Sequence, residues 1–312
     1  MIGVCGEALI DFTPIAVDGA IAYAPRPGGS PCNVAIGLAR LGKKTALISK
    51  ISGDAFGDLL RAHLTENDVD LRWLARGSEP SALAFVIPSA DGGHDFAFYG
   101  VDTAEQRLMI ADVPDSFPDE LTALHFGSYS LMLGDSARTY EALMRREHGN
   151  RVISLDPNVR PSLFPDRDKY RARIEGLLPF ATVVKASEDD LAWLHPDERP
   201  VDVAARWLSA GPALVVVTLG AKGAFAKSAT DVMQSAAPKV NVADTVGAGD
   251  AFMSALLAHL DDLDLLHRDA LAMLSADAII DVLEYANRAA AIACTRIGAD
   301  PPKADVASGL TG

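Results

Sequence analysis

The sequence predicts an α/β protein, a three-layer α/β/α sandwich around a mostly parallel central sheet, with a smaller β-sheet beside it. Short apolar runs rich in Val and Ile recur along the 312 residues, as strands buried on both faces do. Amphipathic stretches with helical spacing separate these runs, and strand, helix, strand in succession gives parallel strands joined by right-handed crossovers. Two β-rich segments interrupt this order, and they predict the smaller sheet.

Six apolar runs are the candidate strands of the central sheet. In chain order they are IGVCG near Ile2, TALISKI from Thr45, ALHFG from Ala123, RVISLD from Arg151, ATVVKAS from Ala181 and ALVVVTLG from Ala213. Between them, apolar residues fall three or four positions apart, as in Phe56, Leu60 and Leu64 after Gly53-Asp54. This spacing places them on one face of a helix that packs on the sheet.

The two interrupting segments are read as β-hairpins. They are FTPIAVDGAIAYAPRPGG and SALAFVIPSADGGHDFAFYG, and the second carries a turn at Asp91-Gly92-Gly93. We expect both to form one small sheet that covers the ligand edge of the central sheet as a lid. Its aromatic residues Tyr23, Phe85, Phe96 and Phe98 would serve as apolar cover in lid or dimer packing, with substrate contact as the alternative. The predicted division is a core of 1–11, 30–80 and 101–312 and a lid of 12–29 and 81–100.

Composition narrows the class of protein. The formal net charge of −14 argues against a nucleic-acid partner, because phosphate backbones are held by clustered Lys and Arg. No apolar run approaches the roughly 18 residues that span a bilayer, and MIGVCGEALIDF lacks the features of a signal peptide. Cys5, Cys32 and Cys294 are far apart, without metal-ligand spacing. We therefore expect a cytoplasmic protein with reduced thiols and neither a nucleic-acid nor a membrane partner.

Candidate ligand residues lie near the N-terminus. The segment PRPGGSPCNVAIGLARLG opens with Pro and Gly and then becomes helical, and Gly28 and Gly29 let the backbone approach another group closely. Asn33 lies near the start of this helix, where it either caps the helix or contacts a ligand. Asp11 ends the first predicted strand, and ligands bind at the carboxyl ends of strands in open α/β sheets. A structural and a ligand-binding role remain equally open for Asp11.

A second group of candidates lies in ADTVGAGDAFMSALLAHL. Gly247, Ala248 and Gly249 precede Asp250 and a long apolar helix. A helix N-terminus offers free N–H groups and a positive dipole end, and small residues let a phosphate approach them. Helix capping by Asp250 is the alternative. The segment is neither a Walker A loop nor a dinucleotide fingerprint, because the residues that define those motifs are absent.

Both segments resemble signatures of one family. DTVGAGDAF resembles the C-terminal signature of the ribokinase-like (PfkB-type) sugar kinases, and GGSPCNVAIGLARLG resembles their N-terminal signature. VTLGAKGAF is similar to the nucleotide-side strand and loop, and NRAAAIACTRIGADPP to the C-terminal helix and the adenine and monovalent-cation loops. The resemblance covers essentially the whole chain. It implies a ribokinase-like fold and transfer of the ATP γ-phosphoryl group to a sugar hydroxyl.

Within that family the chain looks most like bacterial fructokinases. The segments that carry this resemblance are GEALIDF, DPNVRPSLFPDRDKYRARIE and TRIGADPP. Gly100 departs from the Arg that commonly follows Phe-Tyr in the fructokinase lid, and Lys185 replaces the Asn of the family's Asn-x-x-Glu motif. The alternatives are another acceptor (ribose, a 2-keto-3-deoxy sugar acid, tagatose phosphate or a nucleoside) or a non-catalytic sugar-binding regulator. A sugar acid or phosphate would need extra cations, for which Arg26 and Arg107 are the candidates.

The resemblance also implies roles for single residues. Asp250 would be the general base, and the N–H groups of Gly247, Ala248 and Gly249 would stabilise the developing charge. Arg160 would reach the sugar or the γ-phosphate, with a surface ion pair to a nearby Asp as the alternative. The residues expected to hold the sugar, together with Asp250, are Asp11, Gly28, Gly29, Ser30 and Asn33.

The remaining implied roles concern the nucleotide and the ions. The residues expected at ATP are Lys185, Thr218, Gly220, Lys222, Gly223 and Asn287. Glu188 would act on Mg²⁺ through water, and Asp244 is the candidate for a monovalent cation such as K⁺. Lid closure would exclude water from the γ-phosphate, and the hairpins suggest a homodimer that packs through the lid.

Overall fold

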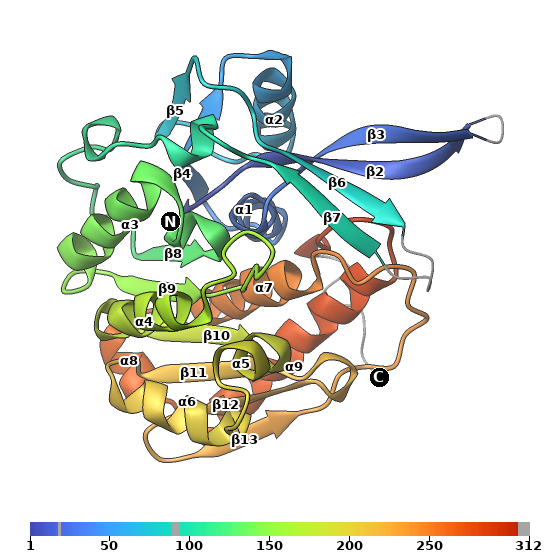
Figure 1. Ribbon diagram of the computed structural model, residues 1–312. Coiled ribbons are helices and arrows are strands. Elements are labelled where there is room, and N and C mark those ends of the chain that lie inside the picture. The colour runs from blue at the N-terminus through green and yellow to red at the C-terminus, as the bar shows by residue number, and fades with distance from the viewer. Residues whose placement is uncertain (18–19, 89–93, 305–312) are drawn as a thin grey trace.

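The computed structural model describes residues 1–17, 20–88 and 94–304 and contains two β-sheets (Figure 1). The larger sheet has the strand order β13-β12-β11-β10-β9-β8-β1-β4-β5. Its strands are β1 (Ile2–Cys5), β4 (Thr45–Ser52), β5 (Leu74–Gly77), β8 (Ala123–Gly127), β9 (Val152–Asp156), β10 (Val183–Ser187), β11 (Leu214–Thr218), β12 (Ala224–Lys227) and β13 (Val232–Ser235). From β5 to β11 all pairings are parallel, and β12 pairs antiparallel with both of its neighbours. The mostly parallel central sheet is thus confirmed.

Helices cover both faces of this sheet (Figure 1). They are α1 (Ser30–Arg40), α2 (Ala55–Glu66), α3 (Gly134–Glu147), α4 (Arg167–Leu177), α5 (Glu188–Leu194), α6 (Pro200–Ser209), α7 (Ala248–Asp262), α8 (Arg268–Ala272) and α9 (Ala276–Cys294). One apolar cluster joins the sheet to α1, α2, α7, α8 and α9, and another joins it to α3, α4, α5 and α6. The three-layer sandwich is confirmed.

The strands read as continuous apolar runs because neighbouring side chains go to different layers. In β11, Leu214 and Val216 pack in the cluster that contains α7 and α9, whereas Val215 and Val217 pack in the cluster that contains α6. A strand buried on both faces gains from an apolar residue at every position.

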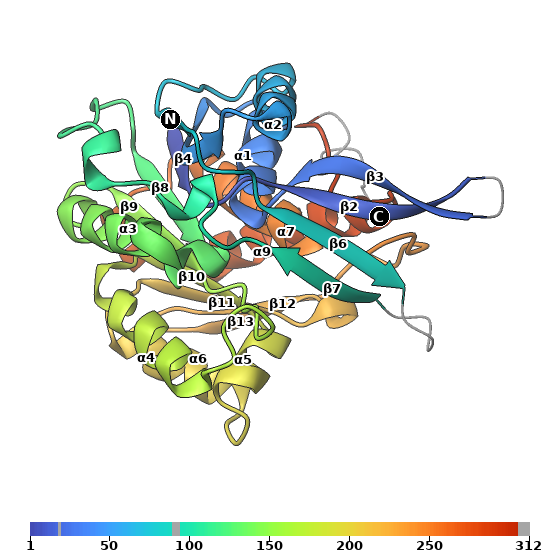
Figure 2. The ribbon, with the colours of Figure 1, turned by 45° about the horizontal axis from the view of Figure 1, so that its top comes forward.

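The smaller sheet consists of β2 (Leu9–Val17), β3 (Ala20–Gly28), β6 (Leu83–Pro88) and β7 (His94–Tyr99), in the order β3-β2-β6-β7. Its two antiparallel hairpins are joined by a parallel pairing of β2 with β6. Figures 1 and 2 show the four strands projecting together from the core. The expected small sheet is confirmed, and its first strand begins at Leu9, before the predicted boundary. Its division from the core at the predicted residues, and its role as a lid, stay predictions.

Two expectations cannot be compared with the structure. The turn at Asp91-Gly92-Gly93 and the side chain of Phe96 lie outside the described residues.

None of the helices in the described part of the chain combines the length and the apolar character needed to cross a bilayer.

Candidate active site

A cavity of about 430 Å³ lies where the small sheet joins the core, at the N-termini of α1 and α7. It brings together candidates from distant parts of the sequence. The predicted residues that line it are Asp11, Gly29, Ser30, Asn33, Phe98, Arg160, Gly247, Gly249 and Asp250. The carboxyl ends of β1 and β9 lead into it, which is the edge where parallel sheets bind ligands.

A larger hollow of about 680 Å³ lies at the opposite ends of the strands, beside the starts of β8 and β9. Its arginines are already bonded to the backbone: Arg146 donates to the Pro114 carbonyl, Arg151 to Leu121 and Arg268 to His148. These guanidinium groups stabilise loops, so the smaller cavity is the better candidate for chemistry.

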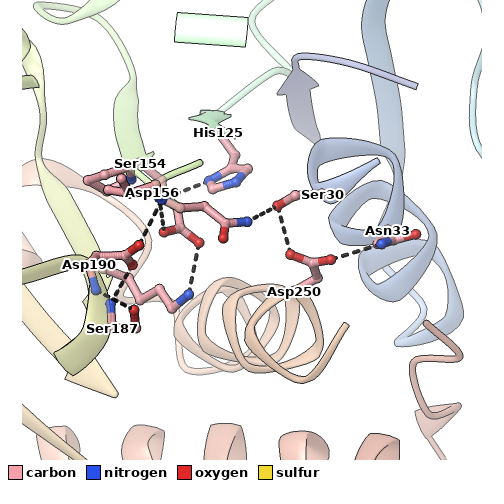
Figure 3. A network of polar contacts seen from close by, with 12 residues as sticks. Ser30, Asn33, His125, Ser154, Asp156, Ser187, Asp190 and Asp250 are labelled. Carbon is pink, nitrogen blue, oxygen red and sulfur yellow. Dashed lines mark hydrogen bonds and ion pairs between the residues drawn. The ribbon is translucent and has the colours of Figure 1, made fainter. Parts of the chain in front are cut away.

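Asp250 is the centre of the smaller cavity. Its Oδ1 accepts a hydrogen bond of 2.7 Å from Ser30 Oγ, and its Oδ2 accepts one of 2.9 Å from Asn33 Nδ2 (Figure 3). The carboxylate is buried, with 7% of the residue exposed. These neutral donors hold the carboxylate in one orientation, and no direct ion pair to Asp250 occurs among the described residues.

Both capping alternatives are wrong. The N-cap of α1 is Gly29 and that of α7 is Gly247, and neither end has a side-chain cap. Asn33 lies in the first turn of α1, and its amide points to Asp250. The side chains that we considered as local caps therefore form a contact between two helices.

Gly28 and Gly29 are required by close approaches. A Cβ at Gly28 would lie 2.0 Å from Asp11 Oδ2. Gly29 has φ +100°, and a Cβ there would lie 2.8 Å from the carbonyl oxygen of Glu7. The two glycines thus let β3 turn into α1 directly beside the Asp11 carboxylate.

The start of α7 has free backbone donors. Gly247 adopts φ +77°, and a Cβ there would meet Ala299 at 2.8 Å. Within the described residues, the N–H groups of Gly247, Gly249 and Asp250 have no hydrogen-bond acceptor, whereas the Ala248 N–H donates to the Thr245 carbonyl. The predicted set of free donors was Gly247, Ala248 and Gly249. In the structure the free N–H groups at the positive end of the helix dipole, where an anion would bind, are those of Gly247, Gly249 and Asp250 among the described residues.

A buried cation lies directly behind this turn. Lys185, in the middle of β10, donates from its Nζ to Asp156 Oδ2 over 2.9 Å, and a Cβ at Gly249 would lie 3.1 Å from this ammonium. Burial opposes the charged form of Lys185, but the carboxylates of Asp156, Asp190 and Asp250 outweigh it and raise its pKa. Gly249 thus leaves room for a fixed positive charge under the turn of residues 247–249, the candidate anion-binding turn.

Arg160 is connected to Asp250 through two side chains. Its Nη1 donates to Asn158 Oδ1 at 2.7 Å, Asn158 Nδ2 donates to Ser30 Oγ at 2.7 Å, and Ser30 donates to Asp250. Asn158 adopts φ +38°, which turns the backbone after β9 toward the cavity. No ion pair of Arg160 occurs among the described residues, so the alternative of a surface ion pair with an Asp is wrong.

Asp11 lies among other carboxylates. Burial raises the pKa of Asp11 to about 7, and the negative charge of Asp250 acts in the same direction. The positive charge of Arg160 opposes this shift. Glu7 also lines the cavity, accepts a hydrogen bond from Ser130, and has its pKa raised by burial. The cavity therefore has a predominantly acidic lining.

The expected nucleotide residues lie outside this cavity. Gly220 and Gly223 form the connection between β11 and β12 with positive φ, and a Cβ at Gly223 would lie 2.1 Å from the Ser235 carbonyl. Lys222 Nζ lies 3.6 Å from Glu188 Oε2, and both side chains are exposed. Thr218 ends β11 next to Ser187 of β10. Their contacts with a nucleotide stay predictions.

Asn287 and Asp244 have structural bonds. Asn287 is buried and donates to the Ser235 carbonyl, which ties α9 to β13. Asp244 accepts hydrogen bonds from the N–H groups of Val246 and Gly298 and so joins the two loops that carry them. The structure leaves the proposed nucleotide and cation contacts of these two residues as predictions.

Some lining residues were not found from the sequence. They are Glu7, Leu9, Ala84, Ser128, Tyr129, Asn158, Ser162, Leu163, Thr245 and Val246. Asn158 carried a usable signal, because it follows Asp156 and a proline directly after a buried strand. Ser128 and Tyr129 lie in a short 3₁₀ turn after β8 (Ser128–Leu131), and no residue pattern marks them as ligands.

Comparison with known proteins agrees with this geometry. Residues 1–305 match the model of the pfkB family of carbohydrate kinases. The chain belongs to this family. As a member it is an ATP-dependent sugar kinase, and both the family resemblance and the enzyme class predicted from the sequence are confirmed.

Individual relatives of this pfkB-family kinase are fructokinases. The chain is 40% identical to a fructokinase of Rhizobium leguminosarum bv. trifolii over 280 residues, covering 89% of this chain and 85% of the relative. It superimposes on the ATP-bound fructokinase of Xylella fastidiosa with a TM-score of 0.90 and 29% sequence identity. The match covers 98% of this chain and 97% of the Xylella chain. It also superimposes on a fructokinase double mutant from Vibrio cholerae with bound fructose, ADP and potassium ion. The TM-score is 0.86 and the sequence identity 29%, and the match covers 99% of this chain and 97% of the Vibrio chain.

Proposed function

We propose that the protein is a fructokinase, which transfers the γ-phosphoryl group of ATP to a hydroxyl of D-fructose. One observation carries the proposal: a carboxylate held by neutral donors lies in an enclosed cavity, next to unpaired N–H groups at a helix N-terminus. A plain phosphate site gains nothing from a carboxylate there, but phosphoryl transfer to an alcohol needs a base for the hydroxyl proton. The names of the similar proteins support fructose as the acceptor.

In the proposed reaction the sugar hydroxyl oxygen forms a bond to the γ-phosphorus, and the bond from that phosphorus to the β–γ bridging oxygen breaks. The hydroxyl proton passes to Asp250, and ADP leaves. Ser30 and Asn33 fix the direction of the Asp250 lone pairs, which places the acceptor hydroxyl between base and phosphorus. Asp11 is suited to bind further hydroxyls, because its oxygens accept their hydrogen bonds.

Charge on the transferring group has three sources of stabilisation in this proposal. The N–H groups of Gly247, Gly249 and Asp250 approach it from the helix end, and the Lys185 ammonium supports the turn from behind. Arg160, which is exposed at the cavity, donates to phosphoryl oxygens or to the sugar. Positioning and electrostatics are the main requirements of phosphoryl transfer.

Mg²⁺ and K⁺ remain part of the proposal. Among the described residues, no three acidic, histidine or cysteine side chains form a metal cluster. Nucleotide-bound Mg²⁺ takes most of its ligands from phosphates and water, so the single partly exposed carboxylate of Glu188 fits a water-mediated contact. Bound Mg²⁺ would neutralise phosphate charge. For K⁺, Asp244 stays the candidate, and the fructokinase double mutant from Vibrio cholerae has a bound potassium ion.

The lining disfavours charged acceptors among the alternatives. Arg107 pairs with Asp102 and Asp135, and the exposed Arg26 donates to Thr13. Neither arginine lines the cavity. A sugar acid or sugar phosphate therefore lacks the extra cations that it would need, whereas ribose and nucleosides stay open as neutral acceptors.

The proposed quaternary structure is a homodimer through the small sheet. Phe12 stacks on Phe85 with ring centroids 4.5 Å apart, and Tyr23 and Tyr99 contact the Phe85 ring edge to face. Tyr99 remains 63% exposed, which leaves part of this aromatic cluster for a second copy to cover. Sedimentation at micromolar concentration tests this, and a monomer would contradict it. A cytoplasmic location, in keeping with three free cysteines, is proposed as well.

A substrate panel at fixed ATP and Mg²⁺ tests the function. We expect saturable ADP release with fructose at low millimolar concentration or below, and little with ribose, a 2-keto-3-deoxy sugar acid, tagatose phosphate or a nucleoside. A strong preference for another acceptor would reject fructose while keeping the kinase. Sugar binding without phosphoryl transfer, in the presence of Mg²⁺ and K⁺, would instead indicate a non-catalytic regulator.

A further inference from the structure

One wall of the cavity is apolar. It is formed by Leu9, Ala84, Phe98, Tyr129 and Leu163. The rings of Phe98 and Tyr129 meet edge to face, with centroids 5.2 Å apart and an interplanar angle of 69°. Leu9, Ala84 and Phe98 come from β2, β6 and β7 of the small sheet, and Phe98 contributes the aromatic ring among these three.

The ring of Phe98 lies directly over Gly100. A Cβ at Gly100 would lie 2.1 Å from Phe98 Cε1 and 2.4 Å from its Cζ. Gly100 is buried, and its carbonyl oxygen accepts hydrogen bonds from Thr103 Oγ1 and Gln106 Nε2. The backbone is thus held in place, so any side chain at residue 100 would displace the ring. Gly100 directly follows the last residue of β7, and the absence of a Cβ there lets the ring lie against the backbone.

The rest of the lining complements this wall. It includes the carboxylates of Glu7, Asp11 and Asp250, and Arg160 is the one basic residue that lines the described cavity. Hydroxyl groups are suited to the carboxylates, and an apolar C–H face is suited to the Phe98 ring. An anionic acceptor would meet repulsion from the carboxylates, and the one hydroxyl among the named residues of the wall, that of Tyr129, already donates to Glu105.

We propose that Gly100 is a specificity-determining position: by lacking a Cβ it lets Phe98 complete an apolar wall that selects a neutral monosaccharide. This inference rests on the proposed fructokinase function and extends it to the residue that shapes the acceptor site. Gly100 acts through Phe98 and is a positioning residue, and the ring of Phe98 makes the contact with the sugar.

The test compares Gly100→Ala, Phe98→Ala and the double variant in steady-state kinetics with fructose and ATP. We expect Gly100→Ala to raise the KM for fructose by about ten- to hundredfold, the range for a lost apolar contact. The KM for ATP should stay within about twofold, because uniform binding is lost on the sugar side only. The double variant should match Phe98→Ala, since without the ring a Cβ at residue 100 meets no clash.

Gly176→Ala is the matched control, because a Cβ there has no heavy atom within 4 Å. It should leave both KM values unchanged. Thermal unfolding of each variant separates misfolding from altered specificity. Where Gly100→Ala does not fold, the comparison of the double variant with Phe98→Ala carries the test, since neither contains the clash.

Two failures can be told apart. A wild-type protein that transfers no phosphoryl group to any neutral sugar would overturn the proposed function. An active wild type whose sugar KM is unaffected by Gly100→Ala would overturn the inference on Gly100 alone. The inference would also be overturned if the fold-increase of the fructose KM in the double variant equalled the product of the two single fold-increases. Independent effects would mean that residue 100 does not act through the Phe98 ring.

Discussion

The acceptor side and the proposed nucleotide side of the site are built differently. On the acceptor side, Asp250, Ser30 and Asn33 are each 7% exposed, and Ser30 and Asn33 both donate hydrogen bonds to Asp250. On the nucleotide side, Lys222 and Glu188 have 73% and 43% of their side chains exposed and form one loose ion pair. The acceptor geometry is therefore set before any ligand binds, as catalysis by positioning requires.

The two buried aspartates of the site show the same contrast on a smaller scale. Asp250 has only neutral donors on its carboxylate, whereas Asp156 is paired with the Lys185 ammonium. The Asp156 carboxylate therefore has a buried ionic partner within the fold, whereas the Asp250 carboxylate lines the cavity, where it can contact a ligand hydroxyl. Sequence position does not reveal this difference, because both are Asp residues beside the same cavity edge.

The largest effect is expected for the base itself. Asp250→Asn should lower kcat at least about a hundredfold, because an amide cannot accept the hydroxyl proton. ATP binding should be largely kept, since the anion-binding turn is backbone. A coupled ADP assay and nucleotide titration measure both. The control is Asp197→Asn, at an exposed position, and near wild-type turnover of Asp250→Asn would reject Asp250 as the base.

A smaller effect on turnover, with a large effect on stability, is expected at the buried ion pair. Lys185→Met leaves Asp156 buried and unpaired, which should cost about 3–5 kcal/mol of unfolding free energy. The Lys185→Met, Asp156→Asn double variant should recover most of that stability. Its kcat should remain at least about tenfold low, because the cation under the anion-binding turn is gone.

Chemical denaturation and steady-state kinetics distinguish these two roles of Lys185. Lys222→Met, which removes an exposed lysine with a partner at 3.6 Å, should change stability by no more than about 0.5 kcal/mol. A double variant that regains full turnover would show that Lys185 is needed for the fold and not for phosphoryl transfer.

The smallest effect concerns pH. Burial raises the pKa of Asp11 to about 7, so this carboxylate becomes protonated as the pH falls through 7 and loses acceptor capacity. The KM for fructose should therefore rise below pH 7, by at most about tenfold per pH unit. Asp11→Asn should have a higher but pH-independent KM between pH 6 and 8. An equally steep profile in Asp11→Asn would assign the titration to another group.

Much of this site could be predicted from the chain. Gly29, Asn33, Gly247 and Asp250 stand in local patterns whose chemistry is readable, and the cavity contains all four. Leu9, Tyr129 and Leu163 could not be predicted, because each is an ordinary apolar residue that becomes a wall only when distant elements meet. Asn33 also shows the limit of local reasoning, since the capping role suggested by its position is wrong.

Periodicity and turn residues were sufficient to predict the layers of the fold, the small sheet and the helix that begins after Gly247. These features depend on short-range spacing, which the chain carries in its own order. Only the tertiary structure decided that Asp250 is held by Ser30 and Asn33 from another helix, that Lys185 lies under Gly249, and that Phe98 lies over Gly100. Contacts between groups a few ångströms apart depend on how whole elements pack, and no local pattern records that distance.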